Sequence, residues 1–577
     1  MAHSCPTFAP ILPGMKQFLP VLEWLPGYRR SLLFGDVVAG LTVGIMLVPQ
    51  GMAYAMIAGL PVEYGLYASL VPQIVYALTG TSRQLAVGPV AMDSLLVASG
   101  LAAMGTASLS EYVALAVLLS LLMGTIQLVL GLFKMGFLVN FLSRPVISGF
   151  TSAAALIIGL NQLKYLFGID VDRSNRVQEL VLSAVRGMDV TNAAALGIGL
   201  AAIGVLLVLK KWAPHIPGAL VVVVAGVLAV IWGGAEVDVV GNVPAGLPAF
   251  DIPVWSTRWM ELLPIAGTLA LIAFMEAISV AKAVEERHDD YTVNPNQELR
   301  ALGLANIAGA FFQAYPTTGG FSRTAVNDAS GAKTGIAALI SAVVVGLVLL
   351  FFTGWFAALP KTVLAAIIMV AVFKLMDWQY PIQLWKTRRD EFVLLLITFA
   401  VTAGIGIVEG IVTGVLLALF FMVFRTARPH MAVLGNVNGY YKNIKRFPEA
   451  VELDDTLVVR FDGQLYYANM NYFAANMERL ISEKGEGLKV LVINAEAINY
   501  IDATAGHRLH QLITEWQARG IRVVMSGVIG PVRDALAKLG LAELMGEDQF
   551  FVKTANAVQG GVPEQAAKHI TSQAEAD

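Results

Sequence analysis

The sequence predicts an all-α integral membrane protein followed by a small α/β domain. Hydrophobic residues make up 56% of the 577 residues, whereas charged residues make up only 14%. Soluble domains usually carry about a quarter charged residues, so the larger part of the chain belongs in a bilayer. Near residue 429 the composition changes, and short apolar strands begin to alternate with amphipathic helices. The chain therefore divides into a transmembrane part, 36–428, and a soluble part, 429–556.

Apolar runs of about 17–25 residues are long enough to span a bilayer as helices. The chain contains about fourteen apolar runs, several of them too short to cross alone. They cover 37–59, 64–78, 87–104, 112–132, 147–160, 193–209, 219–232, 262–283, 299–312, 322–330, 336–359, 363–375, 392–407 and 410–424. Because an even number of spans returns the chain to its starting side, both ends of this part are expected on one side of the membrane.

Basic residues in short loops identify that side as the cytoplasm. Examples are Arg29, Lys134, Lys210 and Arg425. The longer stretch 164–189, on the opposite side, is interpreted as a loop. We therefore expect a multi-pass protein of the cell membrane, with residues 1–35 and the soluble part in the cytoplasm.

The transmembrane part contains two pairs of similar segments. IPGALVVVVAGVLAV, from Ile216, resembles GIVEGIVTGVLLAL, from Gly406, and FLSRPVISGFTSAAALIIG resembles ALPKTVLAAIIMVAVFK. Two copies with an odd number of spans each face opposite ways, which is the inverted-repeat plan of secondary transporters. The alternative is chance similarity among helices rich in Ala, Val and Gly.

The soluble part alternates strand and helix patterns, which predicts helices packed on a sheet. Strands are expected within LVVRFDGQLYYAN, LKVLVINAEAI and IRVVMSGV. Helices are expected within NYFAANMERLISEKG, TAGHRLHQLITEWQARG and PVRDALAKLGLAELM. Residues 557–577 have little apolar surface to bury, so a disordered tail is expected.

Two short, interrupted segments indicate where a substrate would bind. The third opens with QLAVGPVAMD, in which Gly88 precedes Pro89, a residue suited to the first position of a helix. The tenth opens with TTGGFSRTAVN, in which Gly319 and Gly320 break the chain and Ser322 can cap a new helix. These starts occupy matching places in the two halves. Their positive helix ends can therefore converge on one cavity.

Two charged residues within apolar runs are candidates for function. Two helix N-termini of about +0.5 each and the Arg323 guanidinium sum to about +2, which matches a divalent anion. Alternatively, Arg323 neutralises a carboxylate or extends to the membrane interface. Glu276, in LIAFMEAISVAKA, is costly to bury while charged, so we interpret it as a proton-coupling group. The alternative is a permanent structural pair with Arg323 or another base.

The first apolar run adds two polar candidates and the third adds a carboxylate. LVPQGMAYAM places Gln50 and Tyr54 four residues apart on one helix face, after Pro49 interrupts the helical hydrogen bonds. An amide and a phenol suit an oxyanion, although Tyr54 is equally suited to a core position. Asp93 is expected to bind a cation, to pair with Lys or Arg, or to face a water-filled cleft.

These motifs together resemble the sulfate permease (SulP) family, and the soluble part resembles a STAS domain. The likeness covers nearly the whole chain. It is carried by VPQGMAYAMIAGLPVEYGLYASLVPQIVYALTGTSRQLAVGPVA, by MEAISVAKA and by NPNQELRALGLANIAGAFFQAYPTTGGFSRTAVN. The patterns around Glu276 and Arg323 are most similar to those of plant proton-coupled sulfate transporters.

The resemblance implies seven plus seven inverted spans, a core domain and a gate domain that move as an elevator, and a homodimer. The positions that match substrate-binding residues are Gln50, Tyr54, Val87, Gly88, Pro89, Val90, Ser322 and Arg323. Glu276 matches the proton-coupling position, and Asp93 stands where relatives commonly have an apolar residue. Thr504, in NYIDATAGHRL, matches a phosphorylated hydroxyl of soluble STAS relatives; the alternative is that Asp502 and Thr504 cap the following helix.

We therefore expect a proton-coupled sulfate symporter without cofactor or metal. The alternatives are a bicarbonate or dicarboxylate transporter, coupled to protons or sodium, an anion exchanger or channel, or a sensor whose STAS domain reports anion binding. An enzyme is not expected, because GAKTG lacks the spacing of a phosphate-binding loop and no zinc or nucleophile motif occurs. Expected partners are the anion, protons, the lipid bilayer, a second copy of the chain and a cytosolic protein at the STAS domain, but no nucleic acid.

Overall fold

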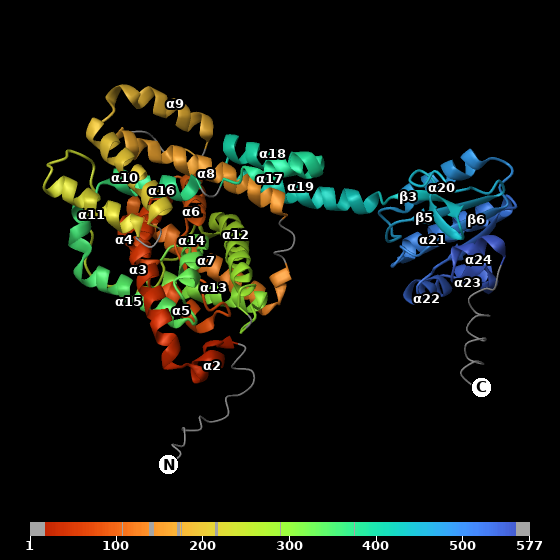
Figure 1. Cartoon of the computed structure of the whole chain (residues 1–577), viewed down its shortest axis with the longest axis horizontal. Coiled ribbons are helices and arrows are strands. Elements are labelled where there is room, and N and C mark those ends of the chain that lie inside the picture. The colour runs from red at the N-terminus through yellow and green to blue at the C-terminus, as the bar shows by residue number, and fades with distance from the viewer. Residues whose placement is uncertain are drawn as a thin grey trace, which may run out of the picture. The chain divides into compact units, whose positions relative to one another are not determined.

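The computed structural model describes residues 18–106, 108–137, 143–169, 174, 176–213, 217–288, 290–373 and 376–560. The chain divides between Ala418 and Leu419, within the helix α19 (Ile407–Ala427), into a helical unit and an α/β unit (Figure 1). For its secondary structure α19 is described with the helical unit. The first predicted segment, 1–35, is not separate from the helices, because α2 lies within it and α3 already begins at Arg30. Residues 1–17 and the predicted tail from 561 onward lie outside the described residues.

The helical unit is built from apolar helices of unequal length. Its helices are α2 (Val21–Trp24), α3 (Arg30–Ala58), α4 (Val62–Tyr67), α5 (Val71–Thr79), α6 (Ala91–Met104), α7 (Leu109–Leu132), α8 (Arg144–Phe167), α9 (Val177–Gly187), α10 (Ala193–Trp212), α11 (Gly218–Ile231), α12 (Trp259–Glu285), α13 (Pro295–Ala310), α14 (Phe321–Ala329), α15 (Ile336–Phe351), α16 (Lys361–Val372), α17 (Gln379–Thr387), α18 (Arg389–Gly404) and α19 (Ile407–Ala427). Every predicted apolar run overlaps one or two of these helices. The run 64–78 is divided into α4 and α5, because Pro72 has no N–H with which to continue the helix.

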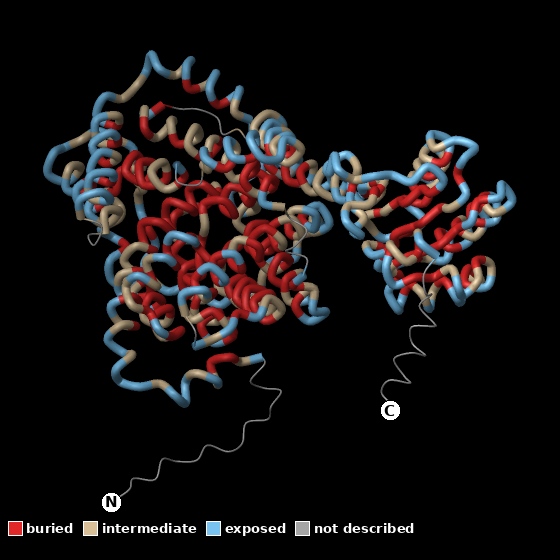
Figure 2. The backbone as a smooth tube through the Cα atoms, turned by 45° about the vertical axis from the view of Figure 1, so that its right-hand side comes forward, coloured by how far each residue is buried: buried red, intermediate tan, exposed pale blue. Residues whose placement is uncertain are grey.

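Length and hydropathy support a membrane location for this unit. Among the described residues, six helices are long and apolar enough to cross a membrane, and four shorter helices are apolar. The six are Arg30–Ala58, Leu109–Leu132, Arg144–Phe167, Ala193–Trp212, Trp259–Glu285 and Glu409–Ala427. Buried positions gather at the centre of the unit, as Figure 2 shows. Outer helices expose apolar side chains, such as Leu200 and Val208 of α10, as helices facing lipid do.

The α/β unit contains a six-stranded sheet in the order β4-β3-β5-β6-β7-β8. Its strands are β3 (Met431–Val437), β4 (Tyr440–Asn443), β5 (Thr456–Phe461), β6 (Val490–Asn494), β7 (Arg522–Ser526) and β8 (Phe550–Phe551). β5 to β8 are parallel, whereas β3 pairs antiparallel with β4 and β5. Alternate residues of each strand face opposite layers. Ile493 therefore packs in the larger core and Val492 in the smaller one.

The helices of this unit are α20 (Met470–Lys484), α21 (Ala503–Ala518), α22 (Gly530–Lys538), α23 (Leu541–Met545) and α24 (Thr554–Gln559). The three predicted strand regions contain β5, β6 and β7. The predicted third helix is broken at Gly540, whose φ of 73° is left-handed. The predicted boundary at 556/557 falls inside α24, because Ala557 is buried in the smaller core.

Candidate functional site

A two-stranded sheet joins the two interrupted segments. β1 (Val87–Gly88) pairs antiparallel with β2 (Thr318–Gly319), with Val87 opposite Gly319 and Gly88 opposite Thr318. The pairing continues at Gly320, whose N–H donates to the Ala86 carbonyl at 3.0 Å. α6 follows β1 and α14 follows β2, so two helices begin close to one point.

The two helix starts differ in detail from the sequence prediction. Pro89 does not occupy the first helical position, because Val90 remains extended as the N-cap and α6 begins at Ala91. Ser322 is not the cap of α14 either. Gly320 is the N-cap, and Ser322 is the exposed second residue of the helix without a capping hydrogen bond. In both cases the β1–β2 pairing, which joins segments distant in sequence, fixes where the extended backbone ends.

Arg323 lies between these two helix starts. Its side chain is only 2% exposed, and Nη1 donates to the carbonyl of Pro89 at 2.6 Å. Nε and Nη2 are buried and have no hydrogen-bond partner. Glycine at position 320 leaves room for this group, because a Cβ there would lie only 2.7 Å from Nη2. A Cβ on Gly88 would be in ordinary contact with Nη2 at 3.5 Å. The guanidinium is thus held on one edge and presents its remaining N–H groups without a protein acceptor.

The two alternatives considered for Arg323, pairing with a carboxylate and extension to the membrane interface, do not match this arrangement. Its burial excludes extension to the membrane interface. Within the described residues, no carboxylate forms an ion pair with it. Glu276 is near enough to interact electrostatically with Arg323, yet its Oε2 is buried without a hydrogen-bond partner. The permanent structural pair considered for Glu276 is therefore not formed with Arg323.

Glu276 is positioned by the packing of α12 on β2 and α14. The Thr318 hydroxyl donates to the carbonyl of Ala273 at 2.7 Å, one turn before Glu276. This bond fastens the helix that carries the carboxylate to the strand that precedes Arg323. The sequence reasoning missed Thr318, whose hydroxyl in the TTGG motif was a signal for such a contact.

Gln50 and Tyr54 are both buried on α3, which runs continuously through Pro49. Gln50 Oε1 has no hydrogen-bond partner, and Tyr54 interacts electrostatically with Arg323. Leu47 of the same helix lies beside β1, with its Cδ1 3.4 Å from the point where a Cβ on Gly88 would stand. The structure therefore brings the polar face of α3 to the two helix starts.

Asp93 lies in the first turn of α6 and is completely buried. Neither carboxylate oxygen has a hydrogen-bond partner. The neighbouring Ser94 hydroxyl is 3.0 Å from the Tyr315 hydroxyl, and Tyr315 interacts electrostatically with Arg323. Tyr315 was not predicted as a site residue. The expected pair of Asp93 with Lys or Arg is not formed within the described residues.

Two buried carboxylates brace the loops that lead into and out of this region. Glu298 accepts from the Thr81 N–H at 2.7 Å and the Thr81 hydroxyl at 2.6 Å, six residues before β1. Asp36 accepts from the Thr334 N–H at 3.0 Å and the Thr334 hydroxyl at 2.7 Å, just after α14. Asn306 of α13 supports β2 through its Oδ1, which accepts from a backbone N–H at 2.8 Å. Sequence reasoning missed all three, although a carboxylate or amide in an apolar helix was an available signal.

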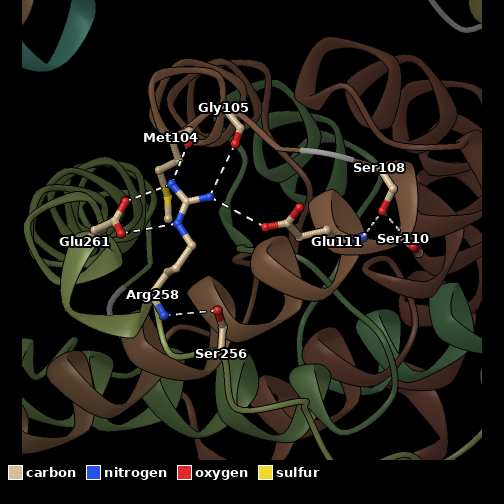
Figure 3. Close-up of polar contacts among 8 residues, drawn as sticks. All are labelled: Met104, Gly105, Ser108, Ser110, Glu111, Ser256, Arg258 and Glu261. Carbon is tan, nitrogen blue, oxygen red and sulfur yellow. Dashed lines mark hydrogen bonds and ion pairs between the residues drawn. The ribbon is translucent and has the colours of Figure 1, made fainter.

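The far end of α6 is tied to the start of α12 by Arg258 (Figure 3). Its guanidinium contacts Glu261 at 2.8 Å and Glu111 at 3.5 Å, and it donates to the carbonyls of Met104 and Gly105. Four groups thus satisfy this arginine. The clamp fixes the relative position of the helices that carry Asp93 and Glu276, which the sequence did not predict.

Comparison with known proteins assigns the chain to a family. A model described as the sulfate permease family matches residues 33–398, and a STAS domain model matches residues 447–559. The chain belongs to the sulfate permease family. Sulfate transporter 4.1, chloroplastic, of Arabidopsis thaliana is 38% identical over 564 residues, covering 94% of this chain and 82% of the relative.

Other members extend this likeness. A probable sulfate transporter of Mycobacterium tuberculosis is 35% identical over 549 residues, covering 93% of this chain and 98% of the relative. The solved structure of SLC26A9 matches with a TM-score of 0.87 at 25% identity, covering 97% of this chain and 94% of that chain. The predicted family resemblance is confirmed. Membership of a family of transporters also supports the prediction that the chain is not an enzyme.

In this member of the family the hydroxyl predicted as a regulatory site, that of Thr504, lies on the STAS domain. Asp502 is the N-cap of α21 and accepts from the Ala505 N–H at 2.7 Å. Its second oxygen accepts from the Tyr467 N–H at 2.9 Å. Thr504 is the exposed second residue of the helix and makes no capping bond. The capping alternative therefore holds for Asp502 but not for Thr504.

Proposed function

We propose that this sulfate permease is a secondary active transporter that takes up sulfate together with protons. The observation that carries the proposal is the buried Arg323, whose Nε and Nη2 groups are unpartnered beside two helix starts. Two helix N-termini and the guanidinium sum to about +2, the charge that a sulfate dianion neutralises. The similarity to proteins named as sulfate transporters in Arabidopsis thaliana and Mycobacterium tuberculosis supports the choice of anion.

Sulfate binds, in this proposal, where the helix starts of α6 and α14 meet. Its oxygens accept from the free N–H groups of Arg323 and from the first-turn backbone of α14 at Ser322. The amide of Gln50 and the hydroxyl of Tyr54 approach from α3. Backbone N–H groups and a guanidinium are directional donors, so they select a tetrahedral oxyanion by geometry as well as by charge.

Glu276 couples this binding to protons. An ionised Glu276 cancels about one unit of the positive charge near Arg323, whereas the neutral carboxyl leaves that charge intact. Protonation of Glu276 therefore favours sulfate binding, and bound sulfate favours protonation by the same factor. Outside, both ligands bind together; inside, where protons are scarcer, both leave.

The wider arrangement belongs to the same proposal. Seven plus seven inverted spans form a core and a gate, the core moves as an elevator, and two copies form a homodimer. The antiparallel pairing of β1 with β2 supports inverted repeats, because an axis in the membrane plane relates two strands in this way. The termini and the STAS domain lie in the cytoplasm, where a cytosolic protein binds the STAS domain and Thr504 serves as a regulatory site.

The test is uptake of radiolabelled sulfate by proteoliposomes that contain the full chain. Uptake is compared at symmetric pH and with an acidic exterior, with unlabelled bicarbonate, fumarate or succinate as competitors. We expect accumulation against the sulfate gradient only when the exterior is acidic. Uphill movement also distinguishes a coupled transporter from a channel or a sensor. Uptake of bicarbonate or a dicarboxylate without sulfate would overturn the substrate, and a sodium requirement would overturn proton coupling.

Glu276→Gln tests the coupling group. This variant is expected to bind sulfate but to accumulate far less of it under an acidic exterior. Glu286→Gln, which changes a carboxylate at the C-cap of the same helix, is the matched control. Equal pH-driven accumulation by Glu276→Gln and the unmodified protein would eliminate Glu276 as a coupling group.

A further inference from the structure

Asp93 is a buried carboxyl on α6 that the proposed sulfate site does not use. It lies three residues after the N-cap Val90, so it is carried by one of the two helices that begin at the site. The side chain has no exposed surface, and neither Oδ1 nor Oδ2 has a hydrogen-bond partner. Among the charged residues that the structure describes, a carboxyl with both oxygens buried and unpartnered occurs only here.

The groups that surround Asp93 contain no cation to balance its charge. α6 packs against α12, which contributes Glu276, the charged group that acts on Asp93. Tyr315, which precedes β2, interacts electrostatically with Asp93 and also with Tyr54 and Arg323. Arg323 itself acts on Glu276 and Tyr315. The charged group that acts on Asp93 is therefore a second carboxylate.

The remaining helices packed on α6 do not supply a cation either. α7 and α8 carry charged residues only at their ends, at Glu111, Arg144 and Lys164. On α3, the polar residues near the site are uncharged. A carboxylate without a partner is strongly destabilised in such surroundings, and two neighbouring carboxylates destabilise each other further.

These observations decide among the three roles that the sequence left open for Asp93. No Lys or Arg pairs with it within the described residues, and its complete burial excludes an open water-filled cleft. A metal cation needs several oxygen ligands, and the described residues contain no group of three His, Cys, Asp or Glu side chains that could hold one. A proton is the cation that a single carboxyl binds without further ligands.

We propose that Asp93 is a second proton-binding site, so that two protons accompany each sulfate. This inference rests on the proposed function. Asp93 and Glu276 each take one proton from the outer solution, forming one O–H bond each, and each releases it to the inside after sulfate has left. Two protons and one sulfate dianion move no net charge. The transport cycle is therefore electroneutral.

The stoichiometry can be measured from the accumulation of sulfate by proteoliposomes at equilibrium. Two coupled protons give an accumulation ratio of about 100-fold per pH unit, whereas one proton gives about 10-fold. A potassium gradient with valinomycin sets the membrane potential independently. The unmodified protein is expected to show the steeper pH dependence and no dependence on potential.

Asp93→Asn is expected to transport with one proton. Its accumulation ratio falls to about 10-fold per pH unit. The ratio also changes about tenfold for each 60 mV of membrane potential, because each cycle now moves one net charge. Asp189→Asn, which alters an exposed aspartate of the same unit, is the matched control and should behave like the unmodified protein. The variant with both Asp93→Asn and Glu276→Gln should lose the pH dependence.

Each result bears on a defined part of the reasoning. If the unmodified protein accumulates sulfate about 10-fold per pH unit and responds to potential, Asp93 carries no coupled proton while the proposed function stands. If its uptake ignores pH, the proposed function itself fails. A sodium requirement that disappears in Asp93→Asn would replace the proton by sodium and overturn the inference. Should Asp93→Asn fail to fold, the measurements on the unmodified protein still decide the stoichiometry.

Discussion

Replacing Arg323 by Lys separates directional hydrogen bonding from charge at the proposed sulfate site. The substitution keeps one positive charge but leaves a single nitrogen donor centre. In the structure Nη1 is committed to the Pro89 carbonyl at 2.6 Å, while Nε and Nη2 are free to donate. A lysine that keeps the Pro89 contact loses at least one charge-assisted bond to sulfate. Such a bond is worth about 1.5 to 3 kcal/mol, so the Kd should rise about 10- to 150-fold.

The assay is sulfate binding to the purified full chain by titration calorimetry, together with uptake by proteoliposomes. Arg186→Lys, an exposed arginine of α9, is the matched control and should leave the Kd unchanged. Thermal unfolding reports whether either variant has lost its fold. A Kd for Arg323→Lys within threefold of the unmodified value, in a folded protein, would refute the idea that the free guanidinium N–H groups bind the anion.

Three further predictions concern a glycine, a helix cap and a surface ion pair. Gly320→Ala is expected to reduce sulfate uptake more than tenfold, because the new Cβ at 2.7 Å displaces the guanidinium. Asp502→Ala removes the cap of α21 and should lower the stability of the full chain to urea by about 1–2 kcal/mol. Burial opposes ionisation of Asp462, but hydrogen bonds from Arg460 and His430 hold its pKa below the ordinary value. The ionised Asp462 therefore stabilises the folded state at neutral pH, and this stabilisation is lost as the pH falls below about 4. Below that pH the unfolding temperatures of Asp462→Asn and the unmodified protein should become equal.

Matched variants accompany these predictions. Gly204→Ala on α10 places a Cβ in open space and should transport normally. Thr504→Ala alters the same helix start as Asp502→Ala without removing a capping bond, so it should leave stability unchanged. Normal uptake by Gly320→Ala would contradict the argument from the guanidinium. Equal stability of Asp502→Ala and Thr504→Ala would contradict the argument from the helix cap. The ion-pair argument would fail if the difference in unfolding temperature between Asp462→Asn and the unmodified protein stayed constant from pH 7 to pH 3.

The long apolar helices could be predicted because hydropathy and length are local properties of the sequence. The short α9 and α17 were missed, since a helix of about ten residues is too short to give the signal of a membrane span. β3, β4 and β8 were missed for a related reason. They lie at or near the edges of the sheet. Pairing of β3 with β5, of β4 with β3 and of β8 with β7 selects their extended backbone more than local pattern does.

The polar candidates of the site could be identified, but their detailed roles at the helix starts could not. Arg323 was recognisable because a charge in an apolar run is costly. The positions of Pro89 and Ser322 relative to their helices depend on the pairing of β1 with β2, which joins residues more than two hundred positions apart. Glu298 and Asp36 act on loops that are equally distant in sequence. Tertiary contacts of this kind leave no periodic signal.

The distribution of unsatisfied polar atoms argues that the site is prepared for charged ligands. The bracing carboxylates Glu298 and Asp36 accept several hydrogen bonds each, although both are completely buried. By contrast, six of the thirteen buried unpartnered side-chain atoms among the described residues belong to Gln50, Glu276, Arg323 and the α6 carboxyl. All of the charged groups in that set are at the site. Each unpaired group costs about 1–3 kcal/mol, or more if it is charged. Because the fold satisfies its other buried charges, the unpaired groups here support the proposal that sulfate and protons complete them.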